Sequence, residues 1–165
     1  MDRKEWHPSQ RGFFAGALYE AMISNKDIWL VCADLGWGIF DKHFKDFPDR
    51  CINTGAAEQA GMGLAVGLAL ENKQVFTYTI TSFYLRAAET IGLYVAGEGV
   101  NVKMVGSGVN DSYKHDGPSH HGRNAQNFMK MLGIESIYPQ NKEEAGKIVE
   151  YMLLSDKPSF VGLQR

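Results

Sequence analysis

The sequence has 165 residues, of which 44% are hydrophobic and 22% are charged, and its formal net charge is -2. This length and composition suit one domain with a sizeable core. The small net charge and the lack of a basic cluster argue against nucleic acid or an anionic membrane as a partner. The N-terminus is polar, and the longest apolar run, residues 60–70, is too short to span a bilayer. Two scattered cysteines, Cys32 and Cys51, are typical of reduced core thiols, so we expect a cytoplasmic protein.

Segments of helical spacing alternate along the chain with short apolar runs that are typical of buried strands. Ser9 precedes the first helical segment as an expected N-cap. The spacing predicts helices at residues 11–24, 39–46, 57–71, 83–96, 123–132 and 141–154. It predicts strands at residues 28–33, 51–53, 74–79, 102–106, 135–138 and 158–163, with a long loop rich in Gly, Asp and His over 107–122.

This alternation predicts an α/β fold: a single doubly wound domain with a mostly parallel sheet and helices on both faces. In such sheets the ligand site lies beyond the carboxyl ends of the strands. Four segments follow predicted strands and are expected to meet at that edge, namely residues 34–36, 55–58, 81–86 and 107–122. The polar candidate residues of the chain lie in these segments.

Glu58 begins an otherwise apolar helix and follows the small residues Gly55, Ala56 and Ala57. An acid in a first helical turn is often only a partner for the helix dipole. Here the small residues leave room for a planar ligand, and a helix this apolar is expected to be buried. Burial suits a carboxyl group that exchanges a proton with a ligand.

The 107–122 loop contains the run HDGPSHH at residues 115–121. Together with Asp111 this run allows a metal site, but its spacing matches no zinc pattern and the loop has no cysteine. We therefore expect no metal ligand from this chain. Asp-Gly-Pro is also ordinary turn chemistry. A loop of this length inside a compact domain is, however, usually functional or disordered.

Phe83 and Arg86 lie at the start of the helix predicted after the third strand. A Phe there is more often part of the core, and an Arg three residues later is usually solvated. Together they can also contact a heteroaromatic ring by stacking or by a cation–π interaction. Gly61, Gly63 and Gly67 mark a face of the preceding helix that permits close packing, either within the fold or against another subunit.

These motifs, in this order, resemble the pyrimidine-binding domain of transketolase and 1-deoxyxylulose-5-phosphate synthase. The resemblance covers residues 9–165 and rests on the ordered set, since any one motif is weak. It implies that residues 1–165 form one pyrimidine-binding domain. The set is Ala33-Asp34-Leu35, Phe47-Pro48-Asp49-Arg50, Gly55-Ala56-Ala57-Glu58-Gln59, Gly67-Leu68-Ala69, Ser82-Phe83-Tyr84-Leu85-Arg86, Asp116-Gly117-Pro118-Ser119-His120, Pro158-Ser159 and Leu163-Gln164-Arg165.

The resemblance assigns cofactor-binding roles. Glu58 matches the glutamate that hydrogen-bonds N1′ of the aminopyrimidine of thiamine diphosphate, which promotes deprotonation of the thiazolium C2. Phe83 and Arg86 match positions that line the pyrimidine. Asp34 matches an aspartate near the cofactor.

The resemblance also implies a substrate site. Asp116 and His120 match residues that bind the hydroxyls and carbonyl of a sugar-like donor, and His120 is a candidate for proton transfer. Arg11 and Arg165 match arginines that bind a substrate phosphate.

Departures from the family pattern limit these expectations. The phosphate-binding serine and histidine of the family are replaced here by Gly38 and Gly108. Phosphate recognition is therefore open, and the donor is expected to be a non-phosphorylated ketose, a keto acid or a nucleotide-linked sugar.

The family's Gly-Asp-Gly motif, which holds the diphosphate and its metal, is missing from this sequence, and the chain ends where the family's C-terminal domain would begin. We therefore expect thiamine diphosphate and Mg²⁺ to be shared with a separate diphosphate-binding subunit in a two-plus-two assembly. The expected activity is transfer of a ketol or acyl unit. A keto-acid decarboxylase or synthase subunit and a non-catalytic interaction protein with this fold remain alternatives.

Overall fold

The computed structural model describes residues 6–110 and 112–165. In this part of the chain six strands form one sheet in the order β2-β1-β3-β4-β6-β5, and all the strand pairs are parallel. The α/β fold with a mostly parallel sheet, predicted from the alternation of periods, is confirmed. The strands are β1 (Ile28–Cys32), β2 (Cys51–Asn53), β3 (Gln74–Ile80), β4 (Val102–Ser107), β5 (Glu135–Ile137) and β6 (Ser159–Leu163).

Helices of three kinds connect the strands. The α-helices are α1 (Gln10–Ser24), α2 (Asp41–Asp46), α3 (Glu58–Leu70), α4 (Ala88–Thr90), α5 (Arg123–Met131) and α6 (Lys142–Leu154). The 3₁₀ segments are η2 (Thr81–Ala87), η4 (Lys114–Asp116) and η5 (Pro118–His120), and η3 (Ile91–Gly97) is a π-helix. The predicted cap of α1 is confirmed, because the Ser9 hydroxyl accepts a hydrogen bond from the Gly12 amide at 3.2 Å.

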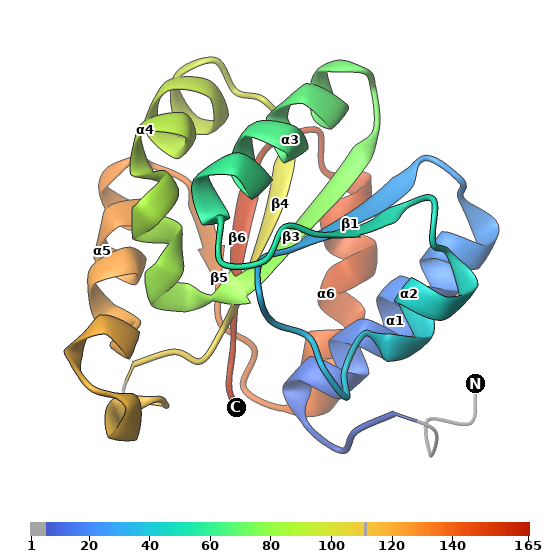
Figure 1. The fold of residues 1–165 in the computed structure, drawn as a ribbon, viewed down its shortest axis with the longest axis horizontal. Helices are drawn as coiled ribbons and strands as arrows, with labels where there is room; N and C mark the ends of the chain where they lie inside the picture. Colours follow the sequence, from blue (N-terminus) through green and yellow to red (C-terminus); the bar gives the residue numbers. More distant parts are fainter. Residues whose placement is uncertain (1–5, 111) are drawn as a thin grey trace.

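The sheet separates two layers of helices (Figure 1). On one face α1 and α6 pack together and bury Phe14, Leu18 and Met152 against the sheet. On the other face α3, η3 and α5 bury Met62 and Ile91 with their neighbours. Because both faces are covered, the central strands are almost entirely buried and mostly apolar, as expected for a buried parallel sheet. Cys32 and Cys51 are buried and free, which agrees with their interpretation as core thiols.

The segment after β3 differs from the single helix predicted at residues 83–96. It is a 3₁₀ helix, one turn of α-helix and a π-helix in succession. The Tyr84 side chain explains why this segment begins with a tightly wound 3₁₀ helix. Its hydroxyl lies against the sheet, 2.9 Å from the Thr77 hydroxyl and 2.9 Å from the Val105 amide, which donates to it. These contacts hold η2 against β3 and β4.

Replacing Tyr84 with Phe tests this anchor. The change deletes the hydroxyl and removes its hydrogen bonds with the buried Val105 amide and Thr77 hydroxyl. We expect the free energy of unfolding to fall by about 1–3 kcal/mol, measured by urea denaturation. Tyr94→Phe is the matched control, because Tyr94 is 47% exposed on η3. An equal effect of the two changes would contradict the anchoring role.

His43, in α2, is fully buried among aromatic rings. Its ring lies 4.9 Å from Phe40, 5.4 Å from Tyr19 and 5.6 Å from Trp6, centroid to centroid. Neither ring nitrogen has a hydrogen-bond partner among the described residues. Burial lowers the pKa of His43 to about 3, and a backbone group of Ala15 offsets only part of that effect. The imidazole is therefore neutral in the folded protein at pH 7.

This buried histidine predicts a loss of stability in mild acid. The unfolded chain takes up the proton near pH 6.5, whereas the folded chain takes it up only near pH 3. The contribution of neutral His43 to the free energy of unfolding is therefore fully present above about pH 6.5. It is lost as the pH falls below that value, by up to about 1.4 kcal/mol per pH unit. His43→Leu should flatten the measured slope between pH 6 and 4.5, and His115→Leu, at an exposed position, should not. An unchanged slope in His43→Leu would show that other groups cause it.

Candidate functional site

The candidate site lies at the carboxyl edge of the sheet, where the strand order reverses. β1 pairs with β2 on one side and with β3 on the other, and such a switch point opens a crevice beyond the strand ends. Asp34, two residues after β1, has a φ of 46°, in the left-handed region that few residues other than glycine adopt. The chain therefore turns sharply where β1 ends. The segments that follow β3 and β4 meet at the same edge.

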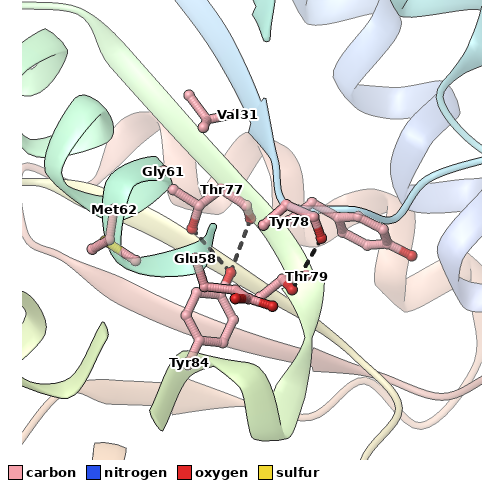
Figure 2. Close-up of a pocket in the computed structure, with 9 residues that line it drawn as sticks. Val31, Glu58, Gly61, Met62, Thr77, Tyr78, Thr79 and Tyr84 are labelled. Carbon is pink, nitrogen blue, oxygen red and sulfur yellow. Dashed lines mark hydrogen bonds between the residues drawn. The ribbon is translucent and has the colours of Figure 1, made fainter. Parts of the chain in front are cut away.

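Glu58 is the first residue of α3 and is only 6% exposed. Its carboxylate lies at a small pocket that is formed by β1, β3, α3 and η2 (Figure 2). The helix N-terminus favours the negative charge. Burial of this residue agrees with the prediction from the apolar helix. The other residues that line the pocket are Val31, Ala33, Gly61, Met62, Thr77, Tyr78, Thr79 and Tyr84.

Arg86 compensates the buried charge of Glu58. Its Nη1 donates to Oε1 of Glu58 at 2.6 Å, and its guanidinium carbon lies 3.8 Å from the centre of the Phe83 ring. A 3₁₀ helix has three residues per turn, so positions 83 and 86 are eclipsed on one side of η2. The irregular segment after β3 therefore creates this stacked pair. The sequence indicated both residues, but not the ion pair with Glu58.

His120 extends the cluster from η5. Its ring lies 4.9 Å from the Phe83 ring in an edge-to-face arrangement, and its Nδ1 lies 3.0 Å from the Ser119 hydroxyl. The Tyr113 ring lies 6.4 Å from His120 on another side, and the guanidinium of Arg165 lies 4.9 Å from Tyr113. A continuous series of contacts therefore runs from Glu58 to Arg165 along the edge of the sheet.

Three of the residues predicted for the site lie apart from these contacts. Asp34 and Asp116 are exposed, and the described part of the chain shows no side-chain contact between them and the cluster. Arg11 is half-buried in the first turn of α1, and its Nε is buried without a hydrogen-bond partner among the described residues. Arg11 acts electrostatically on Tyr78, where it partly opposes the effect of burial in raising the pKa of that phenol. Asp111 lies outside the described residues.

The chain just before Glu58 is open on one side. Gly55 has a φ of 63°, and a Cβ added there would meet nothing within 4 Å. Within residues 6–110 and 112–165, no three His, Cys, Asp or Glu side chains come together to hold a metal. No helix in that part of the chain is long and apolar enough to cross a membrane.

The contacts around Glu58 define what the site can bind. It offers a buried carboxylate, a cation and aromatic edges to a planar ligand with hydrogen-bond donors.

A double-mutant cycle tests the ion pair. Arg86→Met leaves the buried Glu58 carboxylate without its cation, and we expect the free energy of unfolding to fall by about 1–2 kcal/mol because Arg86 is half-exposed. Combining it with Glu58→Gln should recover most of the loss, because no charge is then buried. Lys42→Met breaks an exposed pair with Asp46 and is the control, with no resolvable change in the free energy of unfolding expected. Additive effects of Arg86→Met and Glu58→Gln would exclude the coupling.

Two curated relatives align with most of the chain. A subunit of the apulose-4-phosphate transketolase of Actinobacillus succinogenes is 33% identical over 121 residues, which are 72% of this chain and 39% of that protein. A 6-deoxy-6-sulfo-D-fructose transketolase subunit of a Clostridium species is 30% identical over 158 residues, which are 94% of this chain and 49% of that protein. The chain thus spans about half, or less, of the length of these relatives.

Solved structures agree with the sequence relatives. A split-gene transketolase, described as an inactive β4 tetramer, has a TM-score of 0.82 and 28% identity, covering 95% of this chain and 52% of that chain. Transketolase of Campylobacter jejuni has a TM-score of 0.83 at 18% identity, which supports the fold alone; the match covers 99% of this chain and 27% of that chain. The family model for the pyrimidine-binding domain of transketolase matches residues 7–165. The chain belongs to this family of transketolase pyrimidine-binding domains.

Proposed function

We propose that this chain is the pyrimidine-binding subunit of a thiamine diphosphate-dependent, transketolase-like transferase. The observation that carries the proposal is the buried carboxylate of Glu58 at the start of α3, which is compensated by Arg86 and lies at a small pocket. A buried acceptor beside an aromatic ring fits an aminopyrimidine, which is flat and carries an N–H donor in its protonated form. When bound, thiamine diphosphate supplies the nucleophilic carbon for attack on a substrate carbonyl.

Glu58 and Arg86 have distinct roles in this proposal. Arg86 engages Oε1 of Glu58, so the second carboxylate oxygen is the one that holds a proton at N1′ of the pyrimidine. Phe83, which packs beside Arg86, contributes a face or edge to the ring. Asp34, at the sharp turn after β1, is proposed to lie near the cofactor.

The substrate residues follow along the same edge of the sheet. His120, in contact with Phe83, is proposed to bind the donor and to move a proton at its carbonyl or hydroxyl oxygen. Asp116 would reach the same donor from the preceding turn. Arg11 and Arg165 are cations that suit an acidic group at the far end of a donor. The unpartnered, buried Nε of Arg11 supports this role, since it has a hydrogen bond to give.

A separate diphosphate-binding subunit is part of the proposal. In this proposal Mg²⁺ and the diphosphate are held by the partner, with the pyrimidine on this chain. The relatives from Actinobacillus and Clostridium are both named as subunits, which supports a divided enzyme. Two copies of each chain would give two complete sites.

The donor is proposed to be a ketose or a related keto acid that gives up a ketol or acyl unit. The names of the two relatives refer to a sugar phosphate and a sulfonated sugar as their substrates. Both carry an anionic end, which is compatible with Arg11 and Arg165. A keto-acid decarboxylase or synthase is the alternative, and carbon dioxide release from a keto acid in the absence of ketose cleavage would favour it.

Substitution of Glu58 tests the proposed function. In the assembled enzyme, Glu58→Ala should lower kcat by about 100-fold or more, because the group that holds the pyrimidine proton is lost. Glu89→Ala, which removes an exposed acid from the neighbouring α4, should leave turnover near that of the wild type.

Circular dichroism spectra of both variants exclude unfolding as the cause of any loss. Equal turnover of the wild type and Glu58→Ala would contradict a catalytic role for the site, and it would favour a non-catalytic interaction protein.

A further inference from the structure

Trp37 lies in the loop between β1 and α2, and it is 78% exposed. It borders a mostly apolar groove of about 390 Å³. The groove is lined by Leu35, Gly36, Trp37, Asp41, Phe44 and Asn53. Single exposed hydrophobic residues are common, but a large aromatic side chain beside an apolar groove is typical of a contact with another protein.

The backbone holds Trp37 in this exposed position. Trp37 stands between Gly36 and Gly38, whose φ values of 116° and 71° lie in the region that favours glycine. The Phe40 amide donates to the Gly36 carbonyl at 2.8 Å, and the Gly38 amide donates to Oδ1 of Asp41 at 3.0 Å. These hydrogen bonds shape the loop before any partner binds, so an association through Trp37 pays little for ordering it.

The groove borders the backbone that leads into the Glu58 site. The Trp37 loop follows β1 at the carboxyl edge of the sheet, and Asn53 ends the neighbouring strand β2 (Figure 1). Oδ1 of Asn53 accepts hydrogen bonds from the amides of Asp34 and Gly55, at 3.3 and 2.9 Å. Gly55 comes three residues before Glu58. A partner that encloses a cofactor at Glu58 therefore has the Trp37 groove within reach.

The groove lies away from the proposed substrate residues. His120 and Arg165 follow β4 and β6, whereas the groove follows β1 and β2, and β3 lies between these two pairs of strands. Gly38, which stands in the Trp37 loop at the position of the family's phosphate-binding serine, has no side chain to offer a donor. A donor that extends from His120 to Arg165 therefore does not fill the groove, and a protein is the better occupant.

The charges around the groove indicate what the partner's surface presents. Asp41 lines the groove, and Asp34 is exposed in the same loop. In the part of the chain that the structure describes, no Lys or Arg belongs to the lining. A complementary surface thus presents an apolar side chain to the groove and a lysine or arginine to Asp41.

We propose that the groove beside Trp37 is the docking site of the separate diphosphate-binding subunit. This inference rests on the proposed function, because the shared cofactor is the reason for that subunit to cover this edge of the sheet. Trp37 is the residue that becomes buried at the centre of the contact, as tryptophan often does in the few residues that dominate a binding energy. Asp41 pairs with the partner's cation.

The experiment measures the Kd between this chain and the protein encoded beside it, by calorimetric titration with saturating thiamine diphosphate and Mg²⁺. Trp37→Ala should raise the Kd at least about 10-fold. Asp41→Asn keeps an oxygen for the Gly38 amide but removes the charge, and it should raise the Kd by about three- to tenfold. Leu154→Ala is the matched control, because Leu154 is 82% exposed at the end of α6, shortly before β6 begins at the opposite edge of the sheet. It should leave the Kd within about twofold of the wild type.

Turnover separates docking from a role in ligand binding. At saturating concentrations of the partner, kcat and the donor KM of Trp37→Ala should return to within about twofold of the wild type, because Trp37 touches neither cofactor nor donor. A changed donor KM with an unchanged Kd between the subunits would show that the groove binds a ligand, and it would overturn the inference.

The outcomes also distinguish this inference from the proposed function. An unchanged Kd in both Trp37→Ala and Asp41→Asn would overturn the docking site and leave the transferase intact. A wild-type chain that forms no complex with the neighbouring protein, or a complex that binds no thiamine diphosphate, would instead overturn the proposed function, and the inference with it.

Discussion

The Tyr84 hydroxyl fixes the short 3₁₀ helix after β3, and the candidate site depends on that constraint. The hydroxyl lies between Thr77 of β3 and Val105 of β4, so η2 cannot slide along the sheet without exposing buried polar groups. The tight winding then stacks Arg86 on Phe83 and directs the guanidinium to Glu58. One hydrogen-bonded phenol in the core thus places a cation where it compensates the acid at the start of α3.

A buried carboxylate is costly unless it is compensated, and here two features share that task. The N-terminus of α3 provides a favourable dipole, and Arg86 provides a direct ion pair. Arg86 is half-exposed, so solvent reaches the ion pair from its side, whereas Glu58 is buried. In the proposed function, the second oxygen of the Glu58 carboxylate accepts the hydrogen bond from the bound ring.

The sequence was sufficient for the fold and for the residues nearest to Glu58. Periodicity located the helices and strands to within a few residues, since both faces of a parallel sheet must be apolar. The small residues before Glu58 indicated space for a ligand. The switch from 3₁₀ to π winding was not predictable from spacing, because it depends on where the Tyr84 hydroxyl meets two strands. Tyr113 was missed for a similar reason: only the folded loop shows its ring beside Gly108.

The sequence also could not show which of the predicted residues contact the Glu58 cluster. Asp34 and Asp116 follow the motif order of the family, yet they are exposed and do not touch the Glu58 cluster in the described residues. Their proposed contacts are with bound ligands. A motif can indicate such contacts, but the structure of the chain without ligands does not contain them. His43 illustrates the opposite case, since a histidine in an amphipathic segment gives no sign that three aromatic rings enclose it.

Calorimetric titration of thiamine diphosphate with Mg²⁺ tests the central claim most directly. The titration is made into this chain alone, into the chain with the protein encoded beside it, and into that mixture with Glu58→Ala. We expect one cofactor to bind per copy of this chain, at least about 10-fold more tightly with the partner than without it, and we expect Glu58→Ala to weaken this binding. Absence of binding with the partner, or equal binding by the wild type and Glu58→Ala, would contradict the claim that this chain provides the pyrimidine half of a shared site.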